Sequence, residues 1–246
     1  MSRNAFRSGN PALSSNTFRN VENSSDHVMT LEGAVNKTII SLLLLVSSGY
    51  YTFTNEITSF VFIGFIGGFI TAMVTIFKKH LSPYTVPLYA VLEGLALGGI
   101  SAMYSSMYDG IVQQAILITI GIFGALLFAY KTKIINVTEN FKLGLFAATG
   151  GIFLIYIINM IMSFFGSGLP IMNIQNASLM SIGFSVIVII IAALNLVLDF
   201  DFIEQGAEQG APGYMEWYSA FGLLVTLIWL YLEILRLLAK LQSRRD

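Results

Sequence analysis

Apolar residues recur along this chain in seven long runs separated by polar or turn-forming stretches. Each run is about 20 residues long, the length at which an α-helix crosses a hydrocarbon core roughly 30 Å thick. A transmembrane β-barrel would instead show segments of about 10 residues with strict apolar–polar alternation. We therefore predict an all-α membrane protein whose seven helices lie near residues 34–54, 57–77, 85–106, 110–130, 141–165, 177–201 and 217–239.

The stretches between the runs carry the signals that end helices. They include Asp109-Gly110, the region around Pro170, and the run FIEQGAEQGAPG at residues 202–213, which we predict to be a loop. Glycines recur within the second to fifth runs at spacings that allow close helix contact, and we interpret them as ordinary bundle packing. These glycines are Gly64, Gly67, Gly68, Gly94, Gly98, Gly99, Gly121, Gly124, Gly144, Gly150 and Gly151.

The N-terminal part of the chain has a different character. Residues 1–30 are polar and hold no apolar core, which predicts a flexible cytoplasmic tail and not a signal peptide. A seven-helix transmembrane domain over residues 31–246 follows.

The composition of the whole chain also indicates a membrane protein. Overall, 55% of residues are hydrophobic and 11% are charged, and the mean hydropathy is +0.74. That is more apolar surface than a soluble domain of this length buries, so the chain needs a bilayer.

The distribution of Lys and Arg predicts the orientation of the helices. Cytoplasmic loops carry an excess of these residues, and nine of them lie on the side of the N-terminus, at Arg3, Arg7, Arg19, Lys37, Lys78, Lys79, Lys131, Lys133 and Lys142. The N-terminus should therefore be cytoplasmic. Seven full spans would place Lys240, Arg244 and Arg245 outside, against the rule, unless the last segment is re-entrant or broken.

Carboxyl groups inside the apolar runs are the candidates for function. A charge in lipid is costly, so such residues usually face a water-filled cavity or a partner. Glu93, Asp199 and Glu233 lie within runs, and Asp201 follows Asp199 at the predicted end of the sixth helix. The alternatives are a purely structural role for Glu93, a solvated helix end for Asp201, Glu204 and Glu208, and a local pair of Glu233 with Arg236, three residues away.

Enzyme signatures are missing. The histidines, His27 and His80, lie in the tail and in a loop, so an intramembrane Ser-His pair would have no base. The zinc-protease sequence H-E-x-x-H is absent, and so is a Gly-rich phosphate loop. Without cysteine there is no thiolate chemistry. We expect neither an enzyme nor a bound cofactor, and no nucleic-acid partner.

Three stretches carry a resemblance to a known family. LYAVLEGLALGGIS in the third run, LNLVLDFDFIEQG in the sixth and AFGLLVTLIWLYLEILRLLAKL in the last resemble the Bax inhibitor-1 family, in its bacterial branch with an extended polar N-terminus. The resemblance covers residues from about 30 to 241. It implies a fold in which six helices surround the last one, a bacterial inner membrane location, and a pH-sensitive calcium leak with Ca²⁺ as a permeant or transiently bound ion.

The resemblance also implies roles for individual acids. Two carboxyls on the sixth and seventh helices share a proton as a pH latch; Asp199 matches the first, and Glu233 matches the second where the family has Asp. Asp201 stands where the family has Gln. Asp199 and Glu233 are then the expected transient Ca²⁺ ligands. Two neighbouring carboxyls in a low dielectric cannot both ionise easily, so the pair holds a proton and opposes calcium flux until the pH rises.

Helix depth leaves the partner of Asp199 open. In straight helices Glu233 lies far deeper in the membrane than Asp199, so the two would not touch. Either the last helix begins later and tilts, or it breaks near Gly222, or the partner of Asp199 is Glu216 or Glu93.

Two other functions also remain open. One is a proton-coupled transporter of a small solute. The other is a regulatory protein that binds a membrane protease or cell-death factor through its tail and loops.

Overall fold

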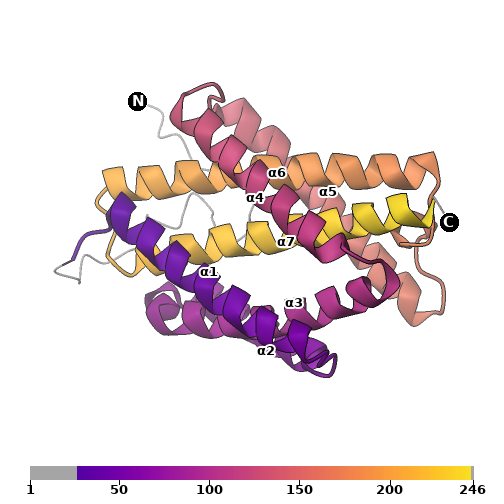
Figure 1. Ribbon diagram of the computed structural model, residues 1–246. Coiled ribbons are helices and arrows are strands. Elements are labelled where there is room, and N and C mark those ends of the chain that lie inside the picture. The colour runs from indigo at the N-terminus through magenta and orange to yellow at the C-terminus, as the bar shows by residue number, and fades with distance from the viewer. Residues whose placement is uncertain (1–26, 245–246) are drawn as a thin grey trace. The chain divides into compact units, whose positions relative to one another are not determined.

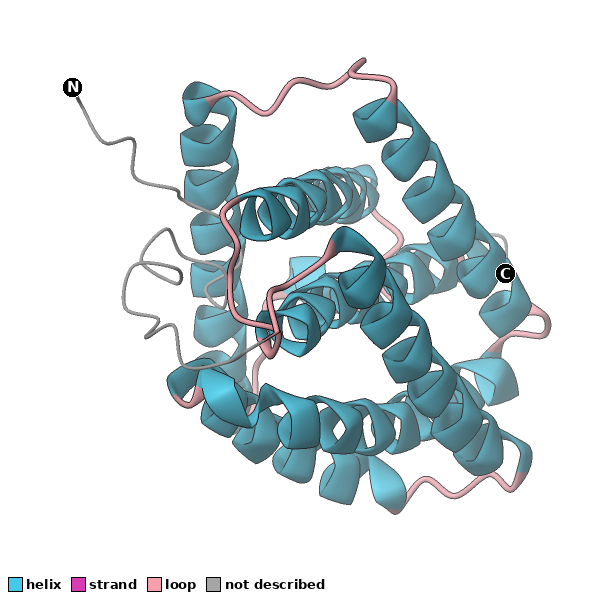
Figure 2. Ribbon diagram, turned by 90° about the vertical axis from the view of Figure 1, so that its left-hand side faces the viewer, coloured by secondary structure: helices cyan, strands magenta, loops and turns pink. Residues whose placement is uncertain are grey.

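The computed structural model describes residues 27–244, and within that range it contains helices and loops and no strand, as Figure 2 shows. Seven helices are long and apolar enough to cross a membrane, which confirms the predicted all-α membrane protein. They are α1 (Leu31–Thr54), α2 (Phe60–Phe77), α3 (Ser82–Met107), α4 (Ile111–Lys131), α5 (Glu139–Phe164), α6 (Leu179–Glu208) and α7 (Met215–Ser243), with two short 3₁₀ helices, η2 (Lys79–Leu81) and η3 (Pro170–Met172). Most of the predicted tail, residues 1–26, lies outside the described residues.

The described chain divides into two compact units. Residues 27–107 and 199–225 form the first, and residues 108–198 and 226–244 form the second. The helices α6 and α7 each contribute residues to both units. The prediction that six helices surround the last one involves both units and stays a prediction.

Large apolar side chains are exposed along most of the helices. Examples are Leu43, Phe62, Leu117, Phe153 and Ile187, on α1, α2, α4, α5 and α6. An aqueous solvent would not tolerate so much exposed apolar surface, whereas lipid chains solvate it. The helices therefore identify an integral membrane protein.

The last two helices differ from the prediction at their ends. The helix α6 continues through Glu208, seven residues beyond the predicted end, so most of the 202–213 run is not a loop. Glu, Gln and Ala in this run favour helix, and the glycine at 206 does not stop it. The helix α7 is continuous from Met215 to Ser243. The alternatives of a later start and of a break near Gly222 are therefore wrong.

Within the first unit, α1 and α2 pack against α3, as Figure 1 shows. Glycines make this packing close: a Cβ at Gly98 would overlap the Thr52 hydroxyl and the Gly49 carbonyl of α1. The Thr52 hydroxyl crosses to α3 and donates to the Leu95 carbonyl at 3.1 Å. Gly68 of α2 leaves room for the Glu93 side chain in the same way. Close backbone approach through small residues is a common way for membrane helices to associate.

Five glycines of the second unit have no such role. A Cβ would meet nothing within 4 Å at Gly121, Gly124, Gly144, Gly150 or Gly151. The uniform packing role predicted for the glycines is therefore wrong for these five, because spacing alone does not show whether a neighbouring helix is present.

This contrast predicts the effect of adding one methyl group. Gly98→Ala should lower the free energy of unfolding by about 1–3 kcal/mol, because the backbone of α1 must move to admit the Cβ. Gly121→Ala, the control on α4, should be neutral or stabilising since alanine is the better helix former. Unfolding of both variants in detergent micelles measures the difference. Equal stability of the two would contradict the close α1–α3 packing.

Candidate functional site

Buried polar residues follow a seven-residue period along α7. Ser219, Thr226, Glu233 and Lys240 are each at most 3% exposed. Seven residues make almost two helical turns, so the four side chains lie on one face of the helix. We call this set the α7 polar stripe. Of these four residues, Glu233 alone was predicted from the sequence as a candidate for function.

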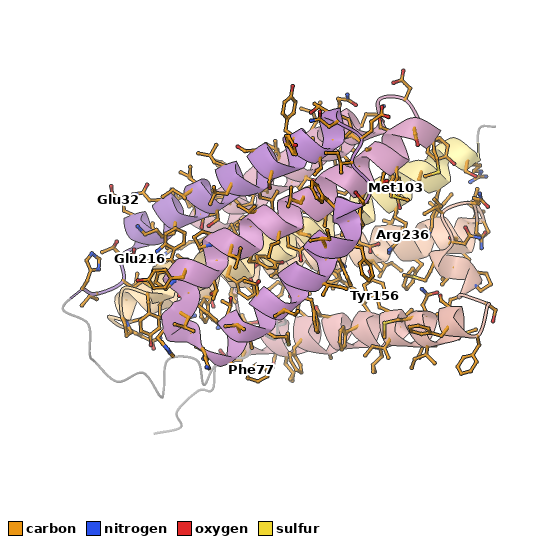
Figure 3. All side chains as sticks on the ribbon, turned by 90° about the horizontal axis from the view of Figure 1, so that it is seen from below. Glu32, Phe77, Met103, Tyr156, Glu216 and Arg236 are labelled. Carbon is orange, nitrogen blue, oxygen red and sulfur yellow. The ribbon has the colours of Figure 1, made fainter. Side chains whose placement is uncertain are left out.

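Glu233 is the centre of a cluster in the second unit. The Tyr156 hydroxyl of α5 donates to Glu233 Oε1 at 2.6 Å. Arg236, one turn further along α7, donates from Nη1 to the same oxygen. The Arg236 guanidinium lies 5.8 Å from the centre of the Tyr156 ring, and Figure 3 labels these two side chains close together. The local pair of Glu233 with Arg236, one of the predicted alternatives, is therefore present.

Trp229 completes this cluster. Its Nε1 donates to the Tyr156 hydroxyl at 3.2 Å, so the hydroxyl both accepts and donates. Neither Tyr156 nor Trp229 was among the candidates predicted from the sequence. Their chemistry could have indicated a role in the site, since the polar group of an aromatic side chain needs a partner when it is buried.

Some buried polar atoms have no hydrogen-bond partner within residues 27–244. They include Glu233 Oε2 and Ser219 Oγ on α7, and Asn195 Oδ1 on α6. Buried polar atoms in folded proteins are nearly always paired, with protein groups or with water or an ion. The two oxygens on α7 belong to its polar stripe, so that stripe is suited to contact water or ions.

Asp199 lies inside α6 and not at its end. It is 1% exposed and stands nine residues before Glu208, which corresponds to roughly 14 Å along the helix. The expectation that Asp199 and Asp201 close the sixth helix is therefore wrong, for the reason given for α6 above. One turn earlier, the Asn195 amide donates to the Thr149 hydroxyl of α5 at 2.9 Å and to the Ile191 carbonyl.

The remaining acids of α6 lie towards the solvent. Asp201 is half-buried and accepts a hydrogen bond from Gln205 at 2.7 Å. Glu204 and Glu208, predicted to lie in a loop, are exposed on the last turns of the helix. Asp199 is thus the buried acid of this segment.

Glu93 lies half-buried on α3, facing Gly68 of α2. Among the described residues, none forms a hydrogen bond or an ion pair with its carboxyl group. Asp199 belongs to the same unit, and no hydrogen bond joins the two acids. The structure therefore leaves the carboxyl of Glu93 without a fixed partner.

Glu216 has a local structural role. Its Oε1 accepts from the backbone N–H and the hydroxyl of Thr30, both at 3.0 Å, at the N-terminus of α1. Figure 3 labels Glu216 close to Glu32 in the first turn of α1. A Cβ at Gly33 would overlap the Glu216 carboxyl. No hydrogen bond links Glu216 to Asp199 in the part of the chain that the structure describes.

Backbone contacts join the same two segments. Met29 N–H donates to the Ala211 carbonyl at 2.7 Å, and Gly213 N–H donates to the His27 carbonyl at 2.8 Å. The start of α1 is therefore held against the loop between α6 and α7. Since α1 and α7 begin side by side, α7 starts on the same membrane side as α1.

The described residues contain no group of three His, Asp or Glu side chains that could hold a metal ion.

Lys240 forms a separate polar centre at the other end of α7. Its Nζ is buried and donates to the Ile171 carbonyl, the Ser181 carbonyl and the Ser185 hydroxyl. Lys240 lies within α7 and not in a tail after it, and these three oxygen atoms replace water around its charge.

Comparison with known families and proteins identifies the family of the chain. No curated protein matches the chain. The family model described as Bax inhibitor 1 like matches residues 10–243, nearly the whole length. That range includes the helices α6 and α7 with Asp199, Glu233 and Lys240. The chain therefore belongs to the Bax inhibitor 1 like family.

Proposed function

We propose that this protein is a pH-sensitive calcium leak channel of the Bax inhibitor-1 type, gated by protonation of buried carboxyl groups. The observation that carries the proposal is the set of buried polar groups on membrane-spanning helices. Asp199 and Glu233 are at most 2% exposed, and Glu233 Oε2 has no partner among residues 27–244. Carboxylates at membrane depth are costly and usually mark ion or proton pathways.

The proposed closed state holds a proton on Asp199. A neutral carboxyl neither repels a neighbouring carboxylate nor attracts a cation. Loss of that proton leaves a carboxylate, which offers the hard oxygen ligand that Ca²⁺ prefers. We propose Asp199 and Glu233 as transient Ca²⁺ ligands. Their sharing of one proton rests on the family resemblance, since the two residues belong to different units.

The sign of the pH effect follows from the charge. At acidic pH the carboxyl is neutral and the path is closed; as the pH rises the carboxylate forms and calcium passes. Flux should therefore increase from acidic to alkaline pH. Glu233 already has a cationic neighbour in Arg236, so we assign the larger part of the pH response to Asp199.

The test is ion flux through purified protein in liposomes. Calcium, potassium and sodium are compared at several pH values between about 5 and 8, the range around physiological pH. Calcium flux that grows with pH supports the proposal. Flux that saturates and requires a small solute would identify a transporter instead. Absence of flux at every pH would favour the regulatory function.

We also propose a bacterial inner membrane location, which rests on the family resemblance. The N-terminus then lies in the cytoplasm, on the evidence of the nine cations on one side. A reporter fused before residue 30 should then read as cytoplasmic, and one inserted near Asp109 as external. Both reporters on the same side would contradict the orientation.

A further inference from the structure

Lys240 holds a positive charge at a buried position near the end of α7. Its ammonium group has three N–H donors, and the chain supplies three acceptors: the Ile171 carbonyl at 2.8 Å, the Ser185 hydroxyl at 2.9 Å and the Ser181 carbonyl at 3.2 Å. Lys240 itself is 0% exposed. A buried ammonium is tolerated only when its donors are satisfied. We call these three oxygen atoms the Lys240 cage.

The Lys240 cage is built by two segments that both lie far from Lys240 in the sequence. Ile171 lies in η3, between α5 and α6, whereas Ser181 and Ser185 lie in the first two turns of α6. The Ser181 hydroxyl also donates to the Ile171 carbonyl at 3.0 Å, which holds η3 against α6. The cage is therefore a formed site and not a chance contact of a mobile side chain.

The chemistry of the cage suits a monovalent cation. Its ligands are two carbonyls and one hydroxyl, all neutral, and no carboxylate contributes. The three contacts are N–H···O hydrogen bonds of 2.8–3.2 Å from an ammonium group, which carries a single positive charge. Calcium sites rely instead on carboxylate oxygens. The cage thus differs from a calcium site in the charge of its ligands.

The position of the cage gives it a consequence for ion flow. Lys240 is the last member of the α7 polar stripe, 24 residues or roughly 36 Å from Glu216 at the beginning of the helix. Because α7 starts on the membrane side of the N-terminus, Lys240 lies towards the opposite side. A fixed positive charge there repels any cation that approaches the stripe from that side.

We propose that the Lys240 ammonium group is a tethered cation that occupies a monovalent-cation site and closes this end of the α7 polar stripe to permeant cations. The closing role rests on the proposed channel function. The cation site itself rests only on the Lys240 cage. Two experiments therefore test the two parts separately.

The first experiment fills the site from solution. Lys240→Ala keeps the Cβ and removes three carbons and the ammonium, which together have the composition of propylammonium. The variant should have a lower midpoint of thermal unfolding in detergent, and propylammonium should restore it, since a ligand that binds only the folded state stabilises it. Propanol, which lacks the charge, should restore little. Lys131→Ala, at an exposed lysine, is the control and should respond to neither compound.

Recovery with propylammonium and not with propanol supports the cation site. Equal recovery with both compounds, or recovery with neither, overturns it. A variant that folds only when propylammonium is present counts as recovery.

The second experiment measures flux in liposomes. Lys240→Ala should pass potassium and calcium at least about tenfold faster than the wild type at the same pH, because the variant removes the electrostatic barrier that a nearby unit charge sets. Propylammonium should reverse the increase. Ser185→Ala removes one acceptor and keeps the charge, so it should increase flux by a smaller factor. This variant still tests the closing role if Lys240→Ala does not fold.

The outcomes separate the two proposals. An unchanged flux in both variants, with a conducting wild type, overturns the closing role. If neither wild type nor variants conduct at any pH, the channel function and the closing role both fail. A propylammonium-specific thermal shift would still support the cation site in that case.

Discussion

Asp199→Asn should hold calcium flux near the low level that the wild type shows at acidic pH, whatever the pH of the assay. Below the pKa of a carboxyl group, its ionised fraction changes about tenfold for each pH unit, and flux gated by one carboxylate should follow it. The amide of asparagine is neutral throughout this range and has nearly the same shape. Asp199 is 1% exposed, so the side chain that replaces it is buried as well. Liposome flux at matched protein density measures the effect.

Asp201→Asn is the matched control, two residues further along α6. Asp201 is half-buried and already accepts a hydrogen bond from Gln205. Its neutralisation should leave the pH profile almost unchanged. If Asp199→Asn retains the wild-type profile, or if Asp201→Asn removes it, Asp199 is not the gating carboxyl.

The helices could be predicted from the sequence because the signal is long and redundant. Each span contains about 20 mostly apolar residues, and single substitutions hardly alter that pattern. The end of α6 could not be predicted in the same way. The run after Asp201 combines polar helix formers with Gly206 and Gly210, and only the structure shows that the helix passes the first glycine and ends before the second.

This error had consequences for the candidate site. A helix end at residue 201 places Asp199 at the membrane surface, among solvated acids. The observed end at Glu208 places it roughly 14 Å inside the helix. The sequence therefore indicated a carboxyl that the structure shows to be buried, but placed it too close to the end of the sixth helix.

Lys240 was misinterpreted for a different reason. A lysine near the end of the last span usually anchors the helix at the cytoplasmic surface, so the sequence indicated a conflict with the orientation. Its acceptors lie at residues 171, 181 and 185, too far along the chain for spacing to reveal. The positive charge is satisfied inside the protein, so Lys240 no longer counts against an external C-terminus.

Arg236→Met should destabilise the protein by about 3 kcal/mol, because it leaves the buried Glu233 carboxylate without its cation. Glu233→Gln should cost less, about 1–2 kcal/mol, since 24% of the Arg236 side chain is exposed and can reach solvent. The double variant removes both charges and should be no less stable than Arg236→Met alone. The free energy of unfolding in mixed micelles gives the coupling, which we expect to be about 1–3 kcal/mol.

The same variants decide which acid works with Asp199. If Asp199 and Glu233 share a proton, Asp199→Asn and Glu233→Gln together should alter flux no more than either alone, whereas Glu93→Gln should add to Asp199→Asn independently. If the effects of Asp199 and Glu233 on flux simply add while Glu233 and Arg236 remain coupled in stability, Glu233 is a structural acid. Asp199 then gates alone, and Glu233 serves its local pair with Arg236 and not the two-acid latch that the family resemblance implies.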